Sequence, residues 1–315
     1  MNRGLNRQRS NRNVGDKSAT RLRPMGFSRV TLQRKPGFCR VILGYQCSRE
    51  EPELRQDGGV DGMIKAVLFD LDDTLLDINF TAFMTRYVAG LSGLLGDISR
   101  TPAPLMGVPF TRGYLAIENR SRSDDLTNHQ AFNREFRALT GIPLDDPVIA
   151  DAINYYDREI VPTLSGGVVA ARPQRGGRKT VDTVHELGLT CALATNPAFS
   201  EACVEARMGW AGLSPEDFVL VSNWDNAYRL KPNARFYQEF VNALGLTCDE
   251  CLMVGNDSRR DFPHPDCGLR TIYVGHAWPR RAVWHGPMSR LARELPNVVR
   301  RFDGEETNRR DIASL

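Results

Sequence analysis

The sequence predicts an α/β protein whose parallel sheet is interrupted once by a long helical segment. From residue 63 onward, short apolar runs of strand length alternate with segments of helical periodicity. Directly after the first run, residues 80–165 carry mainly helical patterns, and polar residues suited to chemistry follow four of the runs. Strands that alternate with helices favour βαβ units, and such units build parallel sheets.

The first predicted strand lies in residues 64–69, a continuous apolar run typical of a strand that is buried on both faces. Later runs of strand length have a similar apolar character. They predict further strands at residues 189–195, 218–222, 251–255 and 270–275.

The helical segment is expected to contain helices within residues 80–95, 128–141 and 145–161. The last of these is predicted to begin at Asp145 or Asp146, because an acid before Pro147 is typical of a first helical turn. Elsewhere the patterns predict helices around residues 180–187, 201–210, 232–244 and 288–296.

This order of strands and helices predicts that the chain has four parts. Residues 63–79 and 166–300 are predicted to form the α/β core, and residues 80–165 a helical domain inserted into it. Because open α/β sheets bind ligands at the carboxyl ends of their strands, an insertion at that edge would cover the crevice as a lid. Residues 1–62 are expected to be a disordered basic extension, with Met63 as a possible alternative start, and residues 301–315 a C-terminal tail.

Charge is distributed unevenly along the chain. Residues 1–62 hold 13 Lys and Arg against 6 Asp and Glu, a net charge of +7, whereas residues 63–315 hold 28 against 32, a net charge of −4. The body of the protein therefore gives no reason to expect a nucleic-acid partner. No apolar run approaches the roughly 18 residues of a membrane-spanning helix, so a membrane partner is not expected either. The oligomeric state stays open.

Seven cysteines are scattered through the chain, and no secretory signal precedes them. An odd, scattered set is typical of free thiols in a reducing compartment, so a cytoplasmic location is expected. Cys248 and Cys251 form a CxxC without a second ligand pair, so they are interpreted as strand and loop thiols rather than a zinc site.

The residues that follow the predicted strands carry the chemistry. The carboxyl ends of parallel strands meet at one edge of a sheet, so side chains that follow them are expected to lie together. They are Asp70, Asp72, Asp73 and Thr74 after the first strand, Thr195 and Asn196 after the second, Lys231 after the third and its loop, and Asn256, Asp257 and Asp261 after the fourth.

This set favours phosphoryl transfer through a covalent aspartyl-phosphate. A carboxylate can act as the nucleophile and divide one difficult displacement into two easier ones. Acids at two strand ends suit Mg²⁺, which takes one or two carboxylates together with water and substrate phosphate. An ammonium and a hydroxyl can stabilise charge on the transferring oxygens, and a second acid can protonate the leaving oxygen.

In this order the motifs resemble those of the haloacid dehalogenase (HAD)-like hydrolase superfamily. The matching motifs span residues 63–275. They are an apolar strand followed by DxDx(T/V), a strand-end Thr, a Lys, and a strand followed by an acidic pair. The resemblance implies a Rossmann-like doubly wound parallel sheet with an all-helical C1-type cap, which residues 80–165 would form. It also implies a phosphatase-type member of the superfamily.

By this resemblance Asp70 is the nucleophile and Asp72 the general acid and base, with the Asp72 backbone carbonyl also touching Mg²⁺. Lys231 would pair with Asp70 and the phosphate. The implied metal-binding residues are Asp70, Asp72, Asp257 and Asp261; Asp257 would bind the metal directly and Asp261 mostly through water. The implied substrate contacts are Thr74, Thr195, Asn196 and Lys231, and Thr74 would also brace the loop.

Other residues near these motifs are expected to have no catalytic role. Asp73 stands where the family often has Gly and is interpreted as a solvated turn residue. Trp210 and Trp224 are interpreted as core or rim packing rather than substrate contacts. The Arg-rich link around residues 172–179 is interpreted as a solvated loop.

The function predicted from the sequence is Mg²⁺-dependent hydrolysis of a small phosphorylated metabolite. A sugar-phosphate mutase is the nearest alternative, since mutases of the superfamily share the same motifs. A dehalogenase is disfavoured because it needs no Mg²⁺ and usually lacks the second acid that Asp72 supplies. A non-catalytic binding protein is the distant alternative, and it would be expected to have lost at least one motif.

Overall fold

The computed structural model describes residues 63–313, with side chains through residue 302. The chain divides into two units, Met1–Gln56 and Asp57–Leu315, and the described residues lie in the second. The predictions made for residues 1–62 lie outside the described residues. No helix in the described part is both long enough and apolar enough to span a bilayer.

The core is a five-stranded parallel sheet in the order β4-β1-β5-β6-β7. Strand β1 (Ala66–Phe69) pairs with β4 (Thr190–Leu193) on one side and β5 (Cys251–Gly255) on the other. β6 (Arg270–Val274) and β7 (Ala282–Gly286) complete the sheet. All four residues of β1 are fully buried, as expected for a strand covered on both faces.

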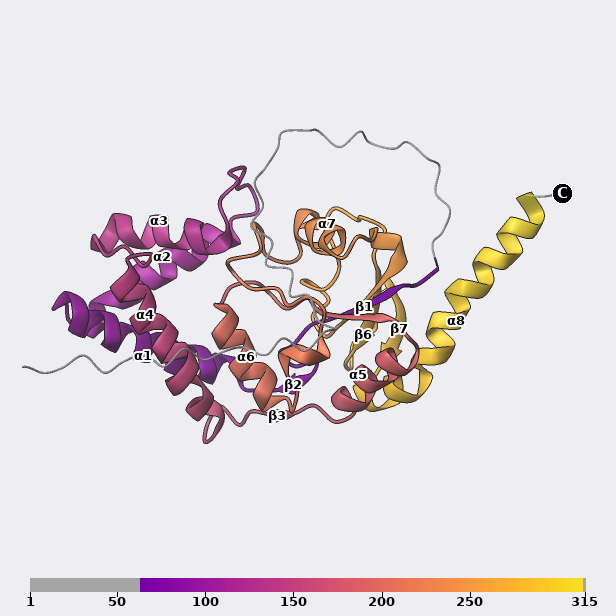
Figure 1. Cartoon of the computed structure of the whole chain (residues 1–315), viewed down its shortest axis with the longest axis horizontal. Coiled ribbons are helices and arrows are strands. Elements are labelled where there is room, and N and C mark those ends of the chain that lie inside the picture. The colour runs from indigo at the N-terminus through magenta and orange to yellow at the C-terminus, as the bar shows by residue number, and fades with distance from the viewer. Residues whose placement is uncertain (1–62, 314–315) are drawn as a thin grey trace, which may run out of the picture. The chain divides into compact units, whose positions relative to one another are not determined.

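Helices cover both faces of the sheet (Figure 1). Side chains alternate along a strand, so Val67 and Phe69 belong to one apolar cluster and Ala66 and Leu68 to the other. The first cluster includes residues of α5 (Gly177–Glu186), α6 (Glu201–Trp210) and α8 (Met288–Ala313). The second includes residues of α7 (Ala234–Ala243). The predicted doubly wound parallel α/β fold is therefore confirmed.

Residues 80–165, called the helical insertion from here on, lie between β2 (Leu76–Asp77) and β3 (Arg172–Pro173). These two short strands pair antiparallel at the point where the chain leaves and re-enters the core. The insertion holds α1 (Phe80–Ser99), α2 (Gly107–Glu118), α3 (Asn128–Thr140) and α4 (Pro147–Tyr155), together with short 3-10 and π turns. Its apolar residues join the same cluster as one face of the sheet.

Local sequence explains where the helices of the insertion begin. Thr127 and Gln130 form a reciprocal capping box at the start of α3. Asp146 caps α4, whose first residue is Pro147, so this predicted start is confirmed. Each cap satisfies backbone N–H groups that the helix itself leaves unpaired.

The strand predicted at residues 218–222 is reduced to a single bridge between Val221 and Leu193. The segment runs beside β4, with Leu193 N–H donating to Leu220 O at 2.8 Å. At the end of the segment the Asn226 side chain donates to the Val221 carbonyl at 2.8 Å. The segment turns into a loop at that residue.

The C-terminal region also differs from the prediction. β7 follows a Pro- and Arg-rich stretch and was not anticipated. Helix α8 does not end near residue 296 but continues through Pro296 to Ala313. Leu291, Leu295 and Val298 extend one buried stripe past the proline, which explains why the helix persists there.

Candidate active site

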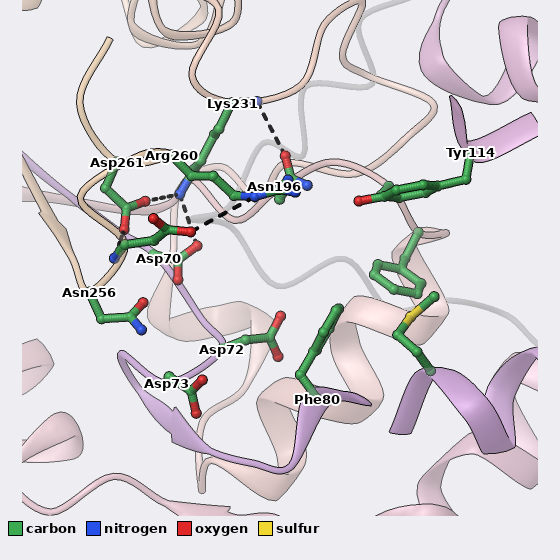
Figure 2. Close-up of a pocket in the computed structure, with 14 residues that line it drawn as sticks. Asp70, Asp72, Asp73, Phe80, Tyr114, Asn196, Lys231, Asn256, Arg260 and Asp261 are labelled. Carbon is green, nitrogen blue, oxygen red and sulfur yellow. Dashed lines mark hydrogen bonds and ion pairs between the residues drawn. The ribbon is translucent and has the colours of Figure 1, made fainter. Parts of the chain in front are cut away.

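Three segments meet at the carboxyl edge of the sheet. Asp70 directly follows β1, Asn256 follows β5, and Lys231 lies just before α7. Lys231 Nζ donates to Asp70 Oδ1 at 2.8 Å and to Asp261 Oδ1 at 2.8 Å (Figure 2). The structure thus brings together three residues that lie 161 and 30 positions apart in the chain.

The three charged side chains of this group are almost fully buried. Asp70 is 8%, Lys231 4% and Asp261 1% exposed. Burial by itself would lower the pKa of Lys231, but the carboxylates of Asp261 and Asp70 outweigh it and raise that pKa. Burial raises the pKa of Asp261, opposed by the ammonium of Lys231. The lysine is therefore held as a cation that offsets repulsion between two buried acids.

Asp261 is fixed from several directions. Its Oδ2 accepts a hydrogen bond from the Asp257 backbone N–H at 2.8 Å, while Oδ1 accepts from Lys231. Gly255 makes room for it, because a Cβ at that position would lie 2.2 Å from Asp261 Cγ. Both oxygens of Asp261 accept a hydrogen bond, so its carboxylate is held against Lys231 Nζ.

The loop after β1 is tied to the loop after β5. The hydroxyl of Thr74, which is fully buried, lies 3.3 Å from Asp70 Oδ2 and 3.1 Å from Asn256 Oδ1. Asn256 lines the cavity beside Asp70, although no site role was predicted for it. The sequence places it at this edge, directly after an apolar strand, but does not indicate its role.

Asp72 has a partner that sequence reasoning missed. Its Oδ2 accepts from Nη1 of Arg207 at 2.5 Å, and the Arg207 side chain is completely buried. Burial raises the pKa of Asp72, and the guanidinium of Arg207 opposes that rise. Arg207 lies on α6 and its guanidinium carbon sits 4.4 Å from the ring centre of Phe199 and 5.6 Å from that of Phe83.

The two predicted site residues that follow β4, Asn196 and Thr195, differ in their access to the cavity. Asn196 lines the cavity, and its Oδ1 accepts from the Lys231 backbone N–H at 3.2 Å. Thr195 is 1% exposed and is not among the residues that line the cavity. Its carbonyl accepts from the Ser222 hydroxyl at 2.7 Å, so Thr195 joins β4 to the following loop.

The helical insertion is attached to the loop that leads to Lys231. Asn128, fully buried at the start of α3, donates from Nδ2 to Pro197 O at 3.0 Å and to Arg229 O at 3.3 Å. Its backbone N–H donates to Ala227 O at 2.8 Å. The Arg260 guanidinium adds a second link by donating to Glu118 of α2 at 2.7 Å.

A cavity of about 400 Å³ opens over these groups. Figure 2 shows its charged residues on one side, with Phe80 and Tyr114 of the insertion on the other. The lining residues are Asp70, Asp72, Asp73, Phe80, Met84, Tyr114, Asn196, Ala198, Phe199, Lys231, Asn256, Asp257, Arg260 and Asp261.

Residues expected to have no catalytic role can also be placed. Asp73 is exposed and adopts a left-handed backbone with φ 57°. Arg172 pairs with Asp77 at 2.5 Å and Arg178 pairs with two aspartates, and none of the three arginines of the link, Arg175 included, lines the cavity. Trp224 is 7% exposed and stacks on His129 with ring centres 4.4 Å apart.

The oxygen atoms at the sheet edge fit a hard divalent cation with few protein ligands. Five carboxylates line the cavity against the two cations Lys231 and Arg260, so negative charge is in excess. Among the described residues, no group of three or more His, Cys, Asp and Glu side chains forms a preassembled metal cluster. Mg²⁺ does not require one, because it keeps several waters and takes one or two carboxylates.

Comparison with known proteins gives a relative and several similar folds. Pyrophosphatase PpaX of Halalkalibacterium halodurans is 24% identical over 217 residues, which cover 68% of this chain and 85% of the relative. Similar solved structures include a HAD phosphatase from Thermococcus onnurineus (17% identity, TM-score 0.46, 75% of this chain and 98% of that chain). Another is the L-2-haloacid dehalogenase of Xanthobacter autotrophicus (16%, 0.42, 74% and 99%). A third is a β-phosphoglucomutase from Clostridium difficile (14%, 0.47, 76% and 99%).

The family assignment comes from the sequence match. The model for haloacid dehalogenase-like hydrolases matches residues 64–263, well over half of the chain. That range begins just before β1 and includes Asp70, Lys231 and Asp261. The chain belongs to the haloacid dehalogenase-like hydrolases.

Proposed function

We propose that this hydrolase cleaves phosphate monoesters of small metabolites through an aspartyl-phosphate on Asp70, with Mg²⁺ as cofactor. The observation that carries the proposal is the buried contact of Lys231 with both Asp70 and Asp261 at 2.8 Å. An ammonium so placed can hold one carboxylate oxygen and also meet the charge of a phosphoryl group.

The proposed first step forms a bond between an Asp70 carboxylate oxygen and phosphorus and breaks the bond from phosphorus to the ester oxygen. Lys231 holds Oδ1, and the Thr74 hydroxyl lies 3.3 Å from Oδ2, so the carboxylate is oriented before substrate arrives. Asp72 donates its proton to the departing alcohol. In the second step Asp72 takes a proton from water, whose oxygen forms a bond to phosphorus as the bond from phosphorus to the Asp70 oxygen breaks; phosphate is released and Asp70 is restored.

Mg²⁺ would be held by Asp70, Asp257 and the backbone carbonyl of Asp72. It would neutralise charge on the phosphoryl oxygens. Asp261 would act on this site mainly through Lys231, because its side chain is almost fully buried and is held by Lys231 Nζ and the Asp257 backbone N–H. This refines the role expected for Asp261 from the sequence.

We also propose that the helical insertion acts as the C1-type cap. Phe80, Met84 and Tyr114 of the insertion line the same cavity as Asp70, which supports this role. A cap in that position would exclude water from the reacting atoms and select the alcohol part of the ester. The five free cysteines of the described part support a reducing, cytoplasmic location for the enzyme.

Two other reactions remain to be separated from this one. The name of the curated relative offers pyrophosphate as a candidate substrate. A sugar-phosphate mutase would use the same aspartate but return the phosphoryl group to a sugar. Incubation with a glucose phosphate and a bisphosphate activator distinguishes the mutase, which would yield an isomer without free phosphate.

The central test is phosphate release from a panel of phosphomonoesters and pyrophosphate with Mg²⁺. Asp70→Asn should lower turnover by about four orders of magnitude or more, because the nucleophile is lost. Asp151→Asn is the matched control, since it makes the same change at an exposed position of α4 that does not line the cavity. Equal phosphate release by wild type and Asp70→Asn would contradict the nucleophile assignment.

A further inference from the structure

A second cavity lies beside the first and is formed mostly by the helical insertion. Its volume is about 220 Å³. It shares Met84, Tyr114, Ala198 and Phe199 with the cavity over Asp70. The two cavities therefore adjoin at a common wall between the insertion and the core.

The walls of the second cavity are almost entirely apolar. Of its polar side chains, Thr111 already donates its hydroxyl to Gly107 O at 2.9 Å, and Tyr114 donates to Glu118 at 3.0 Å. The remaining lining is aliphatic or aromatic, apart from the hydroxyl of Tyr87 and the indole N–H of Trp224. It comprises Met84, Tyr87, Val88, Leu91, Leu95, Phe110, Phe132, Leu144, Ile153, Ala198, Phe199 and Trp224.

We propose that this cavity receives the organic part of the substrate, so that the preferred ester is the phosphate of an alcohol bearing an apolar chain or ring. The inference rests on the proposed phosphatase function and specifies its substrate class. Its position beside the cavity over Asp70 supports it, because an ester substituent that extends from a phosphoryl group near Asp70 toward Phe199 and Tyr114 reaches the wall that the two cavities share. The volume exceeds the roughly 150 Å³ of an apolar protein cavity that accepts benzene.

The same walls disfavour a polyhydroxylated substituent. Beyond the Tyr87 hydroxyl and the Trp224 indole N–H, the lining offers almost no partner, so most hydroxyls of a sugar placed there would give up hydrogen bonds to water without gaining equivalent ones. Selectivity between an alkyl phosphate and a polyol phosphate of similar length therefore measures the character of the cavity. Pyrophosphate has no organic part and would leave the cavity unused.

The test compares methyl, butyl and hexyl phosphate with glycerol 3-phosphate, measured as kcat/KM in the presence of Mg²⁺. Butyl and hexyl alcohols are equally poor leaving groups, so a difference between them reports binding and not chemistry. Each methylene that becomes buried should raise kcat/KM by about fourfold until the cavity is filled. Glycerol 3-phosphate should be turned over more slowly than butyl phosphate.

A matched pair of variants assigns the effect to this cavity. Val88 lines it, whereas Val108 is 66% exposed on α2 and lines neither cavity. Val88→Phe fills part of the space and should lower the hexyl-to-methyl ratio of kcat/KM at least tenfold. Val108→Phe should leave that ratio unchanged.

Binding provides a second measurement that does not depend on turnover. Hexylphosphonate, which cannot be hydrolysed, should alter the tryptophan emission because Trp224 lines the cavity, and Trp224→Phe should remove that change. Phosphate release that is independent of chain length, or faster with glycerol 3-phosphate, overturns the inference while leaving the phosphatase proposal intact. Failure to release phosphate from any monoester overturns both, whether or not pyrophosphate is cleaved.

Discussion

Two buried ionic groups of this enzyme differ in how completely their polar atoms are paired. At the sheet edge, Lys231 bonds two carboxylates, and both oxygens of Asp261 have partners. Where α6 meets the helical insertion, the buried atoms Arg207 Nη2, Asp72 Oδ1 and Asp157 Oδ1 have no hydrogen-bond partner. Native proteins leave few such atoms unpaired, so each calls for an explanation.

The difference separates a fixed part of the site from an adjustable part. A fully paired group keeps its geometry when substrate arrives, which is what a nucleophile and its cation require. In the proposed mechanism Asp72 exchanges a proton with the leaving group and with water, and a free oxygen on it is consistent with that task. Substitutions in the two groups should therefore have different consequences.

The largest effect is expected at Lys231. Lys231→Gln leaves two buried acids without a cation, which should cost about 3–5 kcal/mol in the free energy of unfolding. Turnover should fall by about three orders of magnitude, as a charge-stabilising donor is lost. Denaturant unfolding and phosphate release measure the two effects, and Lys179→Gln, at an exposed position of α5, is the control.

A second change in the same group sharpens this prediction. Lys231→Gln combined with Asp261→Asn should recover part of the lost stability, because it removes one of the uncompensated charges. It should not recover turnover. If the double variant were less stable than Lys231→Gln alone, the charge-compensation argument would be wrong.

A smaller effect on rate is expected at Arg207, which contacts Asp72 and acts as a positioning residue. Arg207→Met should lower kcat by about 10- to 100-fold. Because the guanidinium opposes the rise in the Asp72 pKa caused by burial, its loss should also move the pH profile of kcat to higher pH. Arg207→Lys should restore part of the rate, whereas Arg293→Met, exposed on α8, should change neither quantity.

Asp157 should affect stability in a pH-dependent way. Burial raises its pKa to about 6, against the hydrogen bond from Ser200. The raised pKa means that its contribution to stability is full below about pH 4 and is lost as the pH rises through 6. The loss corresponds to at most about 3 kcal/mol.

Asp157→Asn should therefore be more stable than wild type at pH 8, and the difference should shrink toward pH 4.5. Urea unfolding at several pH values measures it. Asp151→Asn, at an exposed position of α4, is the control and should follow the wild type throughout. A difference for Asp157→Asn that does not vary with pH would contradict the assigned titration.

The smallest effect is expected at Asp73. Its left-handed backbone with φ 57° is unfavourable for most side chains and free of cost for glycine. Asp73→Gly should thus raise the free energy of unfolding by up to about 1 kcal/mol with little change in kcat. Asp77→Gly, at a position without positive φ, should lower stability and serves as the contrast.

The sequence was sufficient to predict the fold and the fixed part of the site. Buried parallel strands are continuous apolar runs, and their carboxyl ends meet at one edge, so Asp70 and Asp261 could be placed together before any coordinates were known. The rule weakens where strands are short. The segment ending at Val221 and strand β7 have backbone pairings that local residue patterns do not specify.

The adjustable part of the site could not be predicted in the same way. Arg207 is buried on a helix, and a local pattern does not reveal whether a charged helical residue faces solvent or a distant acid. The only signal was an arginine within the largely apolar α6, four positions after Cys203. The second cavity likewise depends on how the helices of the insertion pack, which periodicity alone does not determine.

The hydrogen bonds of Asn128 restrict where insertions and deletions can occur in relatives of this chain. Asn128 anchors the helical insertion to the carbonyls of Pro197 and Arg229, which lie near the two ends of the segment that connects Asn196 to Lys231. Adding or deleting a residue within that segment would shift the anchor and the lysine at once. We expect natural insertions and deletions to be rare there and to accumulate in the turns at the far ends of α1 and α3.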